Sequence, residues 1–207
     1  TIFTTHATTI GRSIAGNNKP LYDYLFAYNG CQMAQELNVE AKHSIERQTA
    51  HHVDCFTTVS EVTGRECAEL LDKEADVILP NGFENSFVPK AAAFRKVRGA
   101  ARERIKRVAN ALMGVEISDD ALIVATSGRY EFKNKGIDVF LEALNRSLRN
   151  IHLDREVLAL VDVPGWVACP RQDLQDRLAT GHTFNTPLEH PINTHWLHDM
   201  SNDHVID

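Results

Sequence analysis

Two short apolar runs with a helical stretch between them constrain this chain most strongly. Residues 121–125 and 157–161 are continuous apolar segments bounded by polar residues, a pattern typical of strands buried on both faces of a parallel sheet. From about residue 136 to 149, apolar side chains recur on one side of a helix. Because neighbouring parallel strands need a long crossover, usually a helix, these segments predict a β-α-β unit.

The rest of the chain continues the alternation. We expect further strands in residues 1–6, 55–59 and 76–79, and helices over residues 33–51, 60–72 and 91–113. Ser60 is a suitable N-cap for the second of these helices. After Pro164 the sequence predicts loops with one short helix near residues 173–178. The predicted fold class is α/β with parallel sheets.

Length and charge exclude several classes of protein. A chain of 207 residues is one large domain or parts of two, at about 150 residues per domain. Its net charge of −6 argues against nucleic acid as a partner. No apolar run approaches the ~20 residues of a membrane helix, so we expect no membrane partner. The first residue is Thr1 rather than Met, and we expect a fragment that starts inside a domain.

Cysteine spacing indicates the compartment. The four cysteines contain no C-x-x-C pair, so they predict neither a zinc ribbon nor a redox motif. Buried, reduced cysteines in a cytoplasmic protein are the simpler interpretation.

Residues 91–113 form a predicted basic amphipathic helix. Its arginines and lysines alternate with Ala, Ile, Val and Leu, and a nucleic-acid or membrane surface is one interpretation. We favour a solvated helix face, because Glu103 and the acidic balance of the whole chain offset the positive charge.

Two strand ends carry candidate binding residues, since ligands of open α/β sheets bind at the carboxyl ends of strands. His6 and Arg12 flank a turn of small residues, a site suited to a polar, anionic ligand. After the strand at 121–125, Arg129, Lys133 and Lys135 precede a helix. Such cations, together with free helix N–H groups, predict a phosphate or diphosphate site. A solvated basic loop is the alternative.

Other sites are not supported. The chain has ten histidines, but no H-E-x-x-H motif and no Cys/His zinc spacing, so we predict no metal site. It also lacks a G-x-S-x-G nucleophile elbow and a G-x-x-x-x-G-K-[ST] phosphate loop.

Several blocks, in one order, carry a family resemblance. They are FTTHA (3–7), GR (11–12), IER (45–47) with AH (50–51), FTTVS (56–60), PNG (80–82), GRYEF (128–132) with NKG (134–136), and TH (194–195). With these blocks the chain resembles glycogen synthase of the animal and fungal type, the family that uses UDP-glucose. We expect a bacterial member.

The resemblance implies a GT-B glycosyltransferase, in which two Rossmann-like domains face a cleft. Residues 1–82 would be the C-terminal part of the N-terminal domain, and residues 83–207 the first part of the C-terminal, nucleotide-binding domain. The implied reaction is a retaining transfer of glucose from UDP-glucose to the 4-hydroxyl end of glycogen or another α-1,4-glucan. The resemblance implies no cofactor and no metal, and it leaves a homo-oligomer open.

Roles follow residue by residue from the same resemblance. Arg129 and Lys135 match the catalytic pair that neutralises the donor diphosphate. His6 matches the histidine beside the donor sugar, and Arg12 matches an arginine of the active-site cleft. Asn81, in the PNG block, is assigned to substrate binding.

Parts of the family pattern fall outside these residues. The glycine-rich loop is expected before Thr1 and the glutamate motif after Asp207, so the fragment alone is predicted to be inactive. The long helical insert and the arginine cluster of eukaryotic members are not carried over, nor is their regulation. Two alternatives stay open: a GT-B-like module that binds a sugar nucleotide or polysaccharide without turnover, and a GT-B enzyme that uses ADP-glucose.

Overall fold

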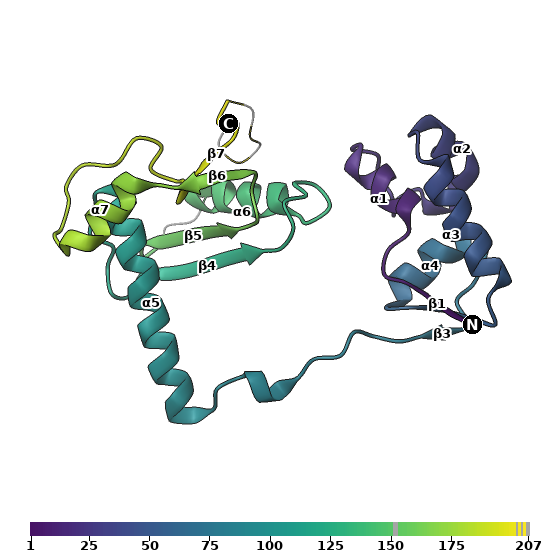
Figure 1. Ribbon diagram of the computed structural model, residues 1–207, viewed down its shortest axis with the longest axis horizontal. Helices are drawn as coiled ribbons and strands as arrows, with labels where there is room; N and C mark the ends of the chain where they lie inside the picture. Colours follow the sequence, from purple (N-terminus) through teal and green to yellow (C-terminus); the bar gives the residue numbers. More distant parts are fainter. Residues whose placement is uncertain (151–152, 202, 204, 206–207) are drawn as a thin grey trace. The chain divides into compact units, whose positions relative to one another are not determined.

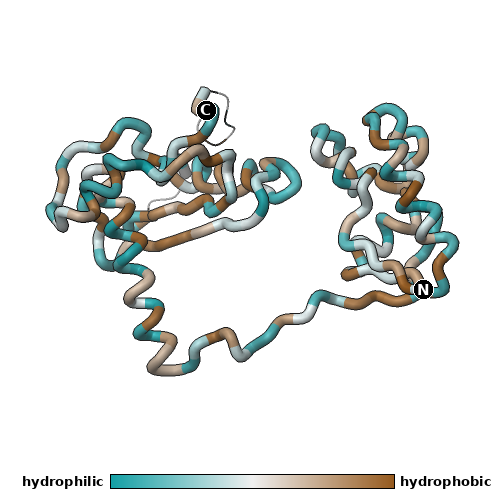
Figure 2. The backbone as a smooth tube through the Cα atoms, viewed as in Figure 1, coloured by the Kyte–Doolittle hydropathy of each residue, from teal (hydrophilic) through white to brown (hydrophobic). Residues whose placement is uncertain are grey.

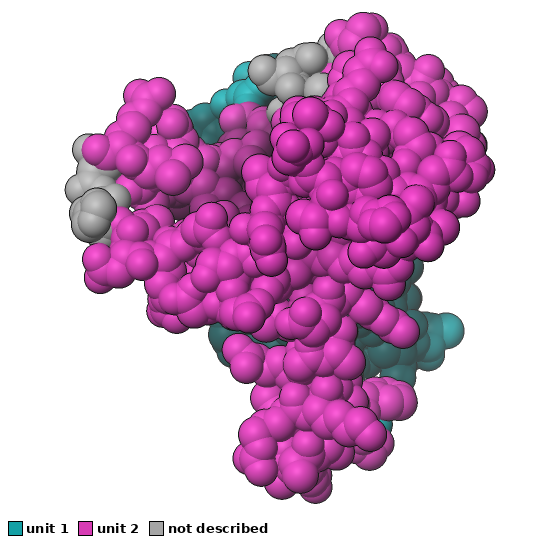
Figure 3. Space-filling view, turned by 90° about the vertical axis from the view of Figure 1, so that its left-hand side faces the viewer, with its two compact units in different colours: residues 1–84 teal, residues 85–207 magenta. Residues whose placement is uncertain are grey.

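The computed structural model describes residues 1–150, 153–201, 203 and 205. They form two compact units, Thr1–Glu84 and Asn85–Asp207 (Figures 1 and 3). Both units mix helices with strands, and both contain a parallel sheet. The predicted class, α/β with parallel sheets, is confirmed. The assignment of residues 1–82 and 83–207 to two parts of larger domains stays a prediction.

The first unit is built on a three-stranded parallel sheet in the order β1-β2-β3. Its strands are β1 (Ile2–Thr5), β2 (Cys55–Thr58) and β3 (Val77–Ile78). Its helices are α1 (Thr9–Gly16), η1 (Leu25–Ala27), α2 (Gly30–Glu36), α3 (Glu40–His52) and α4 (Glu61–Leu70).

Two apolar clusters hold this unit together. The first joins α1, α2 and α4 through Ile10, Ile14, Met33 and Leu70, all nearly inaccessible to solvent. The second cluster packs against the sheet, where the ring of Phe56 stacks on Phe3 at a centroid distance of 5.7 Å. Burial of such side chains contributes about 1.5–3 kcal/mol each, so these clusters fix the helices against the strands.

Two features of the first unit differ from expectation. The single helix predicted over residues 33–51 is broken at Asn38, whose φ of 55° lies in the left-handed region. Asparagine tolerates this conformation, and the chain restarts as α3. Helix α1 was not foreseen, because its Thr- and Ile-rich sequence favours a strand. Its N-cap is Thr8, whose Oγ1 accepts a hydrogen bond from the Gly11 N–H at 2.9 Å.

The second unit contains the predicted β-α-β segment. Its strands are β4 (Leu122–Ser127), β5 (Val157–Asp162), β6 (Val167–Pro170) and β7 (His195–Leu197). Its helices are η2 (Asn85–Phe87), α5 (Ala91–Met113), α6 (Ile137–Asn150) and α7 (Gln172–Thr180). Strands β4 and β5 are parallel, with Leu122 opposite Val157.

The β4-β5 sheet is less buried than predicted. Ala109 of α5 packs with Ala121 and Leu158 in the core, and Figure 2 shows hydrophobic segments along both strands. Leu122, however, is 45% exposed. The expectation of burial on both faces was wrong for the described residues, because this sheet has only two strands there.

Helix α5 has the predicted bounds, and its two halves differ. Residues 91–101 are exposed on all sides, the apolar Phe94 and Val97 included, so the solvated face stays a prediction. In the second half, basic side chains bind the protein itself: Lys106 is buried and pairs with Asp119, and Arg107 donates to the Leu178 carbonyl. Within the residues that the structure describes, no helix is long and apolar enough to cross a membrane.

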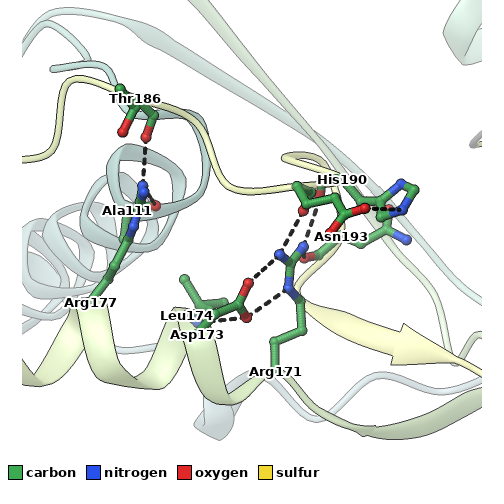
Figure 4. A network of polar contacts seen from close by, with 9 residues as sticks. Ala111, Arg171, Asp173, Leu174, Arg177, Thr186, His190 and Asn193 are labelled. Atoms are coloured by element: carbon green, nitrogen blue, oxygen red, sulfur yellow. Dashed lines mark hydrogen bonds and ion pairs between the residues drawn. The ribbon is translucent and has the colours of Figure 1, made fainter.

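The segment after Pro164 is more ordered than predicted. Besides the expected short helix, α7, it contains an antiparallel pair formed by β6 and β7. Arg171, 1% exposed, connects them: its guanidinium donates to the carbonyls of Glu189, His190 and Asn193 and pairs with Asp173 (Figure 4). Its guanidinium also lies 4.4 Å from the ring centre of Trp196.

Candidate functional site

Three of the predicted residues belong to the first unit. His6 follows the carboxyl end of β1, and Asn81 comes shortly after the end of β3. Because these strands are parallel, both residues lie at the same end of the sheet. Arg12 lies in the first turns of α1, where its N–H donates to the Thr8 carbonyl at 3.1 Å. All three side chains are exposed.

Two glutamates accept hydrogen bonds from the turn that carries His6. Glu46 of α3 accepts hydrogen bonds from Thr5 Oγ1 at 2.7 Å and from the Thr9 N–H at 2.8 Å. Glu66 of α4 accepts from the Thr8 N–H at 3.1 Å and from Thr8 Oγ1. Thr5 and Thr8 are buried, whereas His6 between them is exposed.

Glu66 also reaches a third donor. The Tyr22 hydroxyl donates to its Oε2 at 3.2 Å. Tyr22 is 59% exposed, but partial desolvation raises its pKa and the neighbouring Glu66 carboxylate raises it further, so this phenol stays a donor at neutral pH. The buried carboxylate is thus stabilised by donors rather than left unpaired.

Sequence reasoning missed both glutamates as parts of the site. A signal was present for Glu66, which is four residues before Leu70 and three after Thr63 and therefore lies on the buried face of α4. A charged residue on a buried helix face needs partners. Glu46 gave a weaker signal, because α3 is polar along most of its length and only His43 and Ala50 on the same side are buried.

The other two predicted residues belong to the second unit. Arg129 and Lys135 lie in the loop between β4 and α6, at the carboxyl end of β4. The side chain of Lys135 passes 3.9 Å from the place that a Cβ of Gly128 would take, so the stem of the lysine crosses the start of the loop. Gly136, with a φ of 65°, ends the loop in a conformation that favours glycine.

One part of the predicted anion site was wrong. The N–H groups at the start of α6 are not free: Gly136 donates to the Lys133 carbonyl at 3.1 Å, and Ile137 donates to the Phe132 carbonyl at 3.0 Å. Lys133 is also engaged, since its Nζ lies 2.8 Å from Asp138 Oδ2. This contact and backbone N–H donors hold the pKa of Asp138 below its usual value. The loop therefore offers an anion its side chains, not its helix end.

Arg129 has an internal partner as well. Its Nε lies 3.1 Å from Glu131 Oε1, and its side chain is 60% exposed. An ion pair this exposed contributes little to stability. A more highly charged anion such as a diphosphate could displace the carboxylate at small cost.

The described residues contain no group of three or more His, Cys, Asp or Glu side chains that could hold a metal ion. The five predicted site residues thus fall into two groups, His6, Arg12 and Asn81 in one unit and Arg129 and Lys135 in the other.

Known proteins resemble this chain over most of its length. A family model described as "Glycogen synthase" matches residues 1–169. The human liver glycogen [starch] synthase is 35% identical over 149 residues, which cover 70% of this chain and 21% of the human protein. The glycogen [starch] synthase of Dictyostelium discoideum is 31% identical over 201 residues, 94% of this chain and 22% of that protein.

A fungal relative gives a similar result. The glycogen [starch] synthase of Neurospora crassa is 32% identical over 173 residues, 79% of this chain and 24% of its own length. The chain therefore spans between about a fifth and a quarter of the length of these relatives. The family match covers four of every five residues and includes all five predicted site residues, and the chain belongs to the glycogen synthase family.

Proposed function

We propose that this chain is part of a retaining glucosyltransferase, which transfers glucose from UDP-glucose to the 4-hydroxyl end of glycogen or another α-1,4-glucan. The observation that carries the proposal is the family match over residues 1–169. The arrangement of the loop at 128–136 supports it independently, because two basic side chains lie at the carboxyl end of a parallel strand, where nucleotide ligands bind in open sheets.

In the proposed reaction, the bond between the anomeric carbon and the diphosphate oxygen breaks, the 4-hydroxyl oxygen of the acceptor bonds to the same face of that carbon, and the hydroxyl proton leaves with UDP. Negative charge then develops on the leaving UDP. Arg129 and Lys135 stabilise this charge, and each such preorganised group is worth about 3 kcal/mol of barrier. Arg129, the exposed member of its ion pair with Glu131, exchanges this partner for the diphosphate, so its cost of binding is small.

The residues of the first unit have a different proposed role. His6 lies beside the glucose of the donor, and Arg12 and Asn81 contribute to substrate binding. All three are exposed on the first unit, so they are accessible to a ligand. A correctly placed sugar has its anomeric carbon oriented for the reaction, which lowers the activation barrier.

The finer assignments belong to the same proposal. The two units would be the C-terminal part of the first and the beginning of the second Rossmann-like domain of a GT-B enzyme. The partners would be UDP-glucose and a glucan acceptor, in the cytoplasm, with a homo-oligomer left open.

Turnover of the full-length protein tests the proposal. With glycogen as acceptor, we expect UDP release from UDP-glucose and little or no ADP release from ADP-glucose at the same concentration. Preferential use of ADP-glucose would overturn the donor assignment. Binding of UDP-glucose without any turnover would overturn the assignment as an enzyme.

A further inference from the structure

We propose that Glu46 and Glu66 are positioning residues, which hold the Thr5–Thr9 turn so that His6 meets the donor sugar. The inference rests on the proposed function and adds two residues to its site. Neither glutamate contacts the ligand in this proposal. Both act through the turn.

The hydrogen bonds leave the turn little freedom. Glu46 joins its two ends, since one carboxylate oxygen accepts from Thr5 Oγ1 and the other from the Thr9 N–H. Thr5 is fixed independently to the neighbouring strand, because its carbonyl accepts from Thr58 Oγ1 at 2.9 Å. The residues between these anchor points cannot shift without breaking hydrogen bonds to a charged acceptor, which are the stronger kind.

Glu66 fixes the middle of the turn and the start of α1 together. Its Oε1 accepts from both the N–H and the hydroxyl of Thr8, and the same hydroxyl caps α1 at Gly11. The side chain is 4% exposed, so water cannot substitute for these donors. Thr8 is thereby held in both directions, by the carboxylate and by the helix that it caps.

Gly11 leaves room for the Glu66 carboxylate because it has no side chain. A Cβ at position 11 would lie 2.2 Å from Glu66 Oε1, far closer than two such atoms can approach. A side chain there would displace the carboxylate. The glycine next to Arg12 therefore serves the approach of Glu66 to the helix rather than an unusual backbone angle.

The hydrogen bonds of the two glutamates leave a short segment around His6 exposed. Thr5 is 5% and Thr8 0% exposed, whereas His6 and Ala7 between them are exposed. A short exposed segment held by buried hydrogen bonds on both sides is a preorganised binding surface. Preorganisation reduces the ordering cost on binding.

A glutamine at position 46 can keep both hydrogen bonds of Glu46 without its charge. In Glu46→Gln, the amide oxygen can accept from the Thr9 N–H while the amide NH2 donates to Thr5 Oγ1, which can also accept. Glu46→Ala removes both bonds. If Glu46 acts by geometry, the glutamine variant retains its role and the alanine variant does not. Glu40→Ala, an exposed glutamate of the same helix, is the matched control.

The experiment uses the full-length protein and two ligands. For Glu46→Ala we expect kcat/KM for UDP-glucose and the affinity for UDP-glucose to fall tenfold or more, since small misplacements near the reacting atoms are costly. Affinity for UDP alone should stay within about twofold, because the turn meets only the sugar. Glu46→Gln and Glu40→Ala should resemble the wild type. In a His6→Ala background, Glu46→Ala should have little further effect.

Glu66→Gln and Glu66→Ala repeat the comparison for the second glutamate. If Glu66→Ala fails to fold, the Glu46 set decides. Equal losses for UDP and UDP-glucose, or full activity of Glu46→Ala, would overturn the inference while leaving the proposed function intact. A wild-type protein that does not use UDP-glucose at all would overturn both.

Discussion

At the scale of single residues, the two groups of predicted site residues are arranged in a similar way. The side chains proposed to contact the ligand are exposed, as His6 and Arg129 are, and the groups that hold them are internal to the same unit. In the first unit the holding groups are two carboxylates, the buried Glu66 and the partly buried Glu46. In the second unit they are the backbone of the 128–136 loop, where Lys135 donates its N–H to the Glu131 carbonyl at 2.9 Å.

Lys135 and Lys133 allow a test within one loop. Replacing Lys135 with alanine removes a cation from the proposed diphosphate site, and a charge-assisted hydrogen bond is worth about 1.5–3 kcal/mol. We therefore expect Lys135→Ala to weaken UDP binding by about tenfold or more. Titration calorimetry of the full-length protein measures this.

The matched control is Lys133→Ala, because Lys133 is already paired with Asp138. It should weaken UDP binding much less. Equal losses in the two variants would mean that the loop attracts UDP only by its overall charge, and the specific role of Lys135 would be lost.

How far these residues could be predicted depends on what the sequence displays. The sequence points to Arg129 and Lys135 because basic residues after an apolar strand form a recognisable pattern, and their role stays a prediction. The expectation of free N–H groups beside them was wrong, because the carbonyls of Lys133 and Phe132 accept hydrogen bonds from the N–H groups at the start of α6. Glu46 was not predicted because its partners, Thr5 and Thr9, are distant in sequence. Only the folded chain brings them together.

At the scale of elements, apolar patterns predicted most strands and helices before Pro164 and missed β6 and β7 after it. Helix α5 was predicted because basic and apolar residues alternate along it, and the strands β4 and β5 because each contains a continuous apolar run bounded by polar residues. Strands β6 and β7 are four and three residues long, and they lie in a polar, proline-containing segment without an apolar pattern. They are held in place by Arg171, through contacts that are not local in sequence.

Arg171 offers a prediction for this part of the fold. Arg171→Met removes the hydrogen bonds to three carbonyls and leaves Asp173 without its partner, while the His190 carbonyl keeps the Asn193 N–H as a donor at 3.2 Å. Breaking a buried charged network of this kind costs about 3 kcal/mol. We expect amide protection in residues 189–197 to fall by about a hundredfold in hydrogen exchange by mass spectrometry. The control, Arg155→Met, replaces an exposed arginine of the same unit and should leave this protection unchanged.

Asp173 adds a dependence on pH. Its hydrogen bonds from Arg171 lower its pKa below the ordinary value of 3.8. A carboxylate with a lowered folded-state pKa contributes stability above its unfolded value and loses it as the pH falls through the folded value. The difference in Tm between wild type and Asp173→Asn should therefore be largest above pH 4 and shrink below it. Asp176→Asn, whose carboxylate accepts from the Gln172 amide, is the control, and a constant Asp173→Asn difference would contradict the account.

At the scale of the whole molecule, the described residues form two compact units, and each contains one group of the predicted site residues. Sequence length alone allowed one large domain or parts of two, and only the order of the motifs favoured the second. Periodicity could not choose between them, because it describes local structure and not where one core ends and another begins.

The central claim is that Arg129 stabilises the leaving diphosphate, and the kinetics of one variant test it most directly. In the full-length protein with glycogen as acceptor, Arg129→Ala should lower kcat/KM for UDP-glucose at least about a hundredfold, while the exposed-site control Arg155→Ala retains wild-type activity. Near-normal activity of Arg129→Ala would contradict the account.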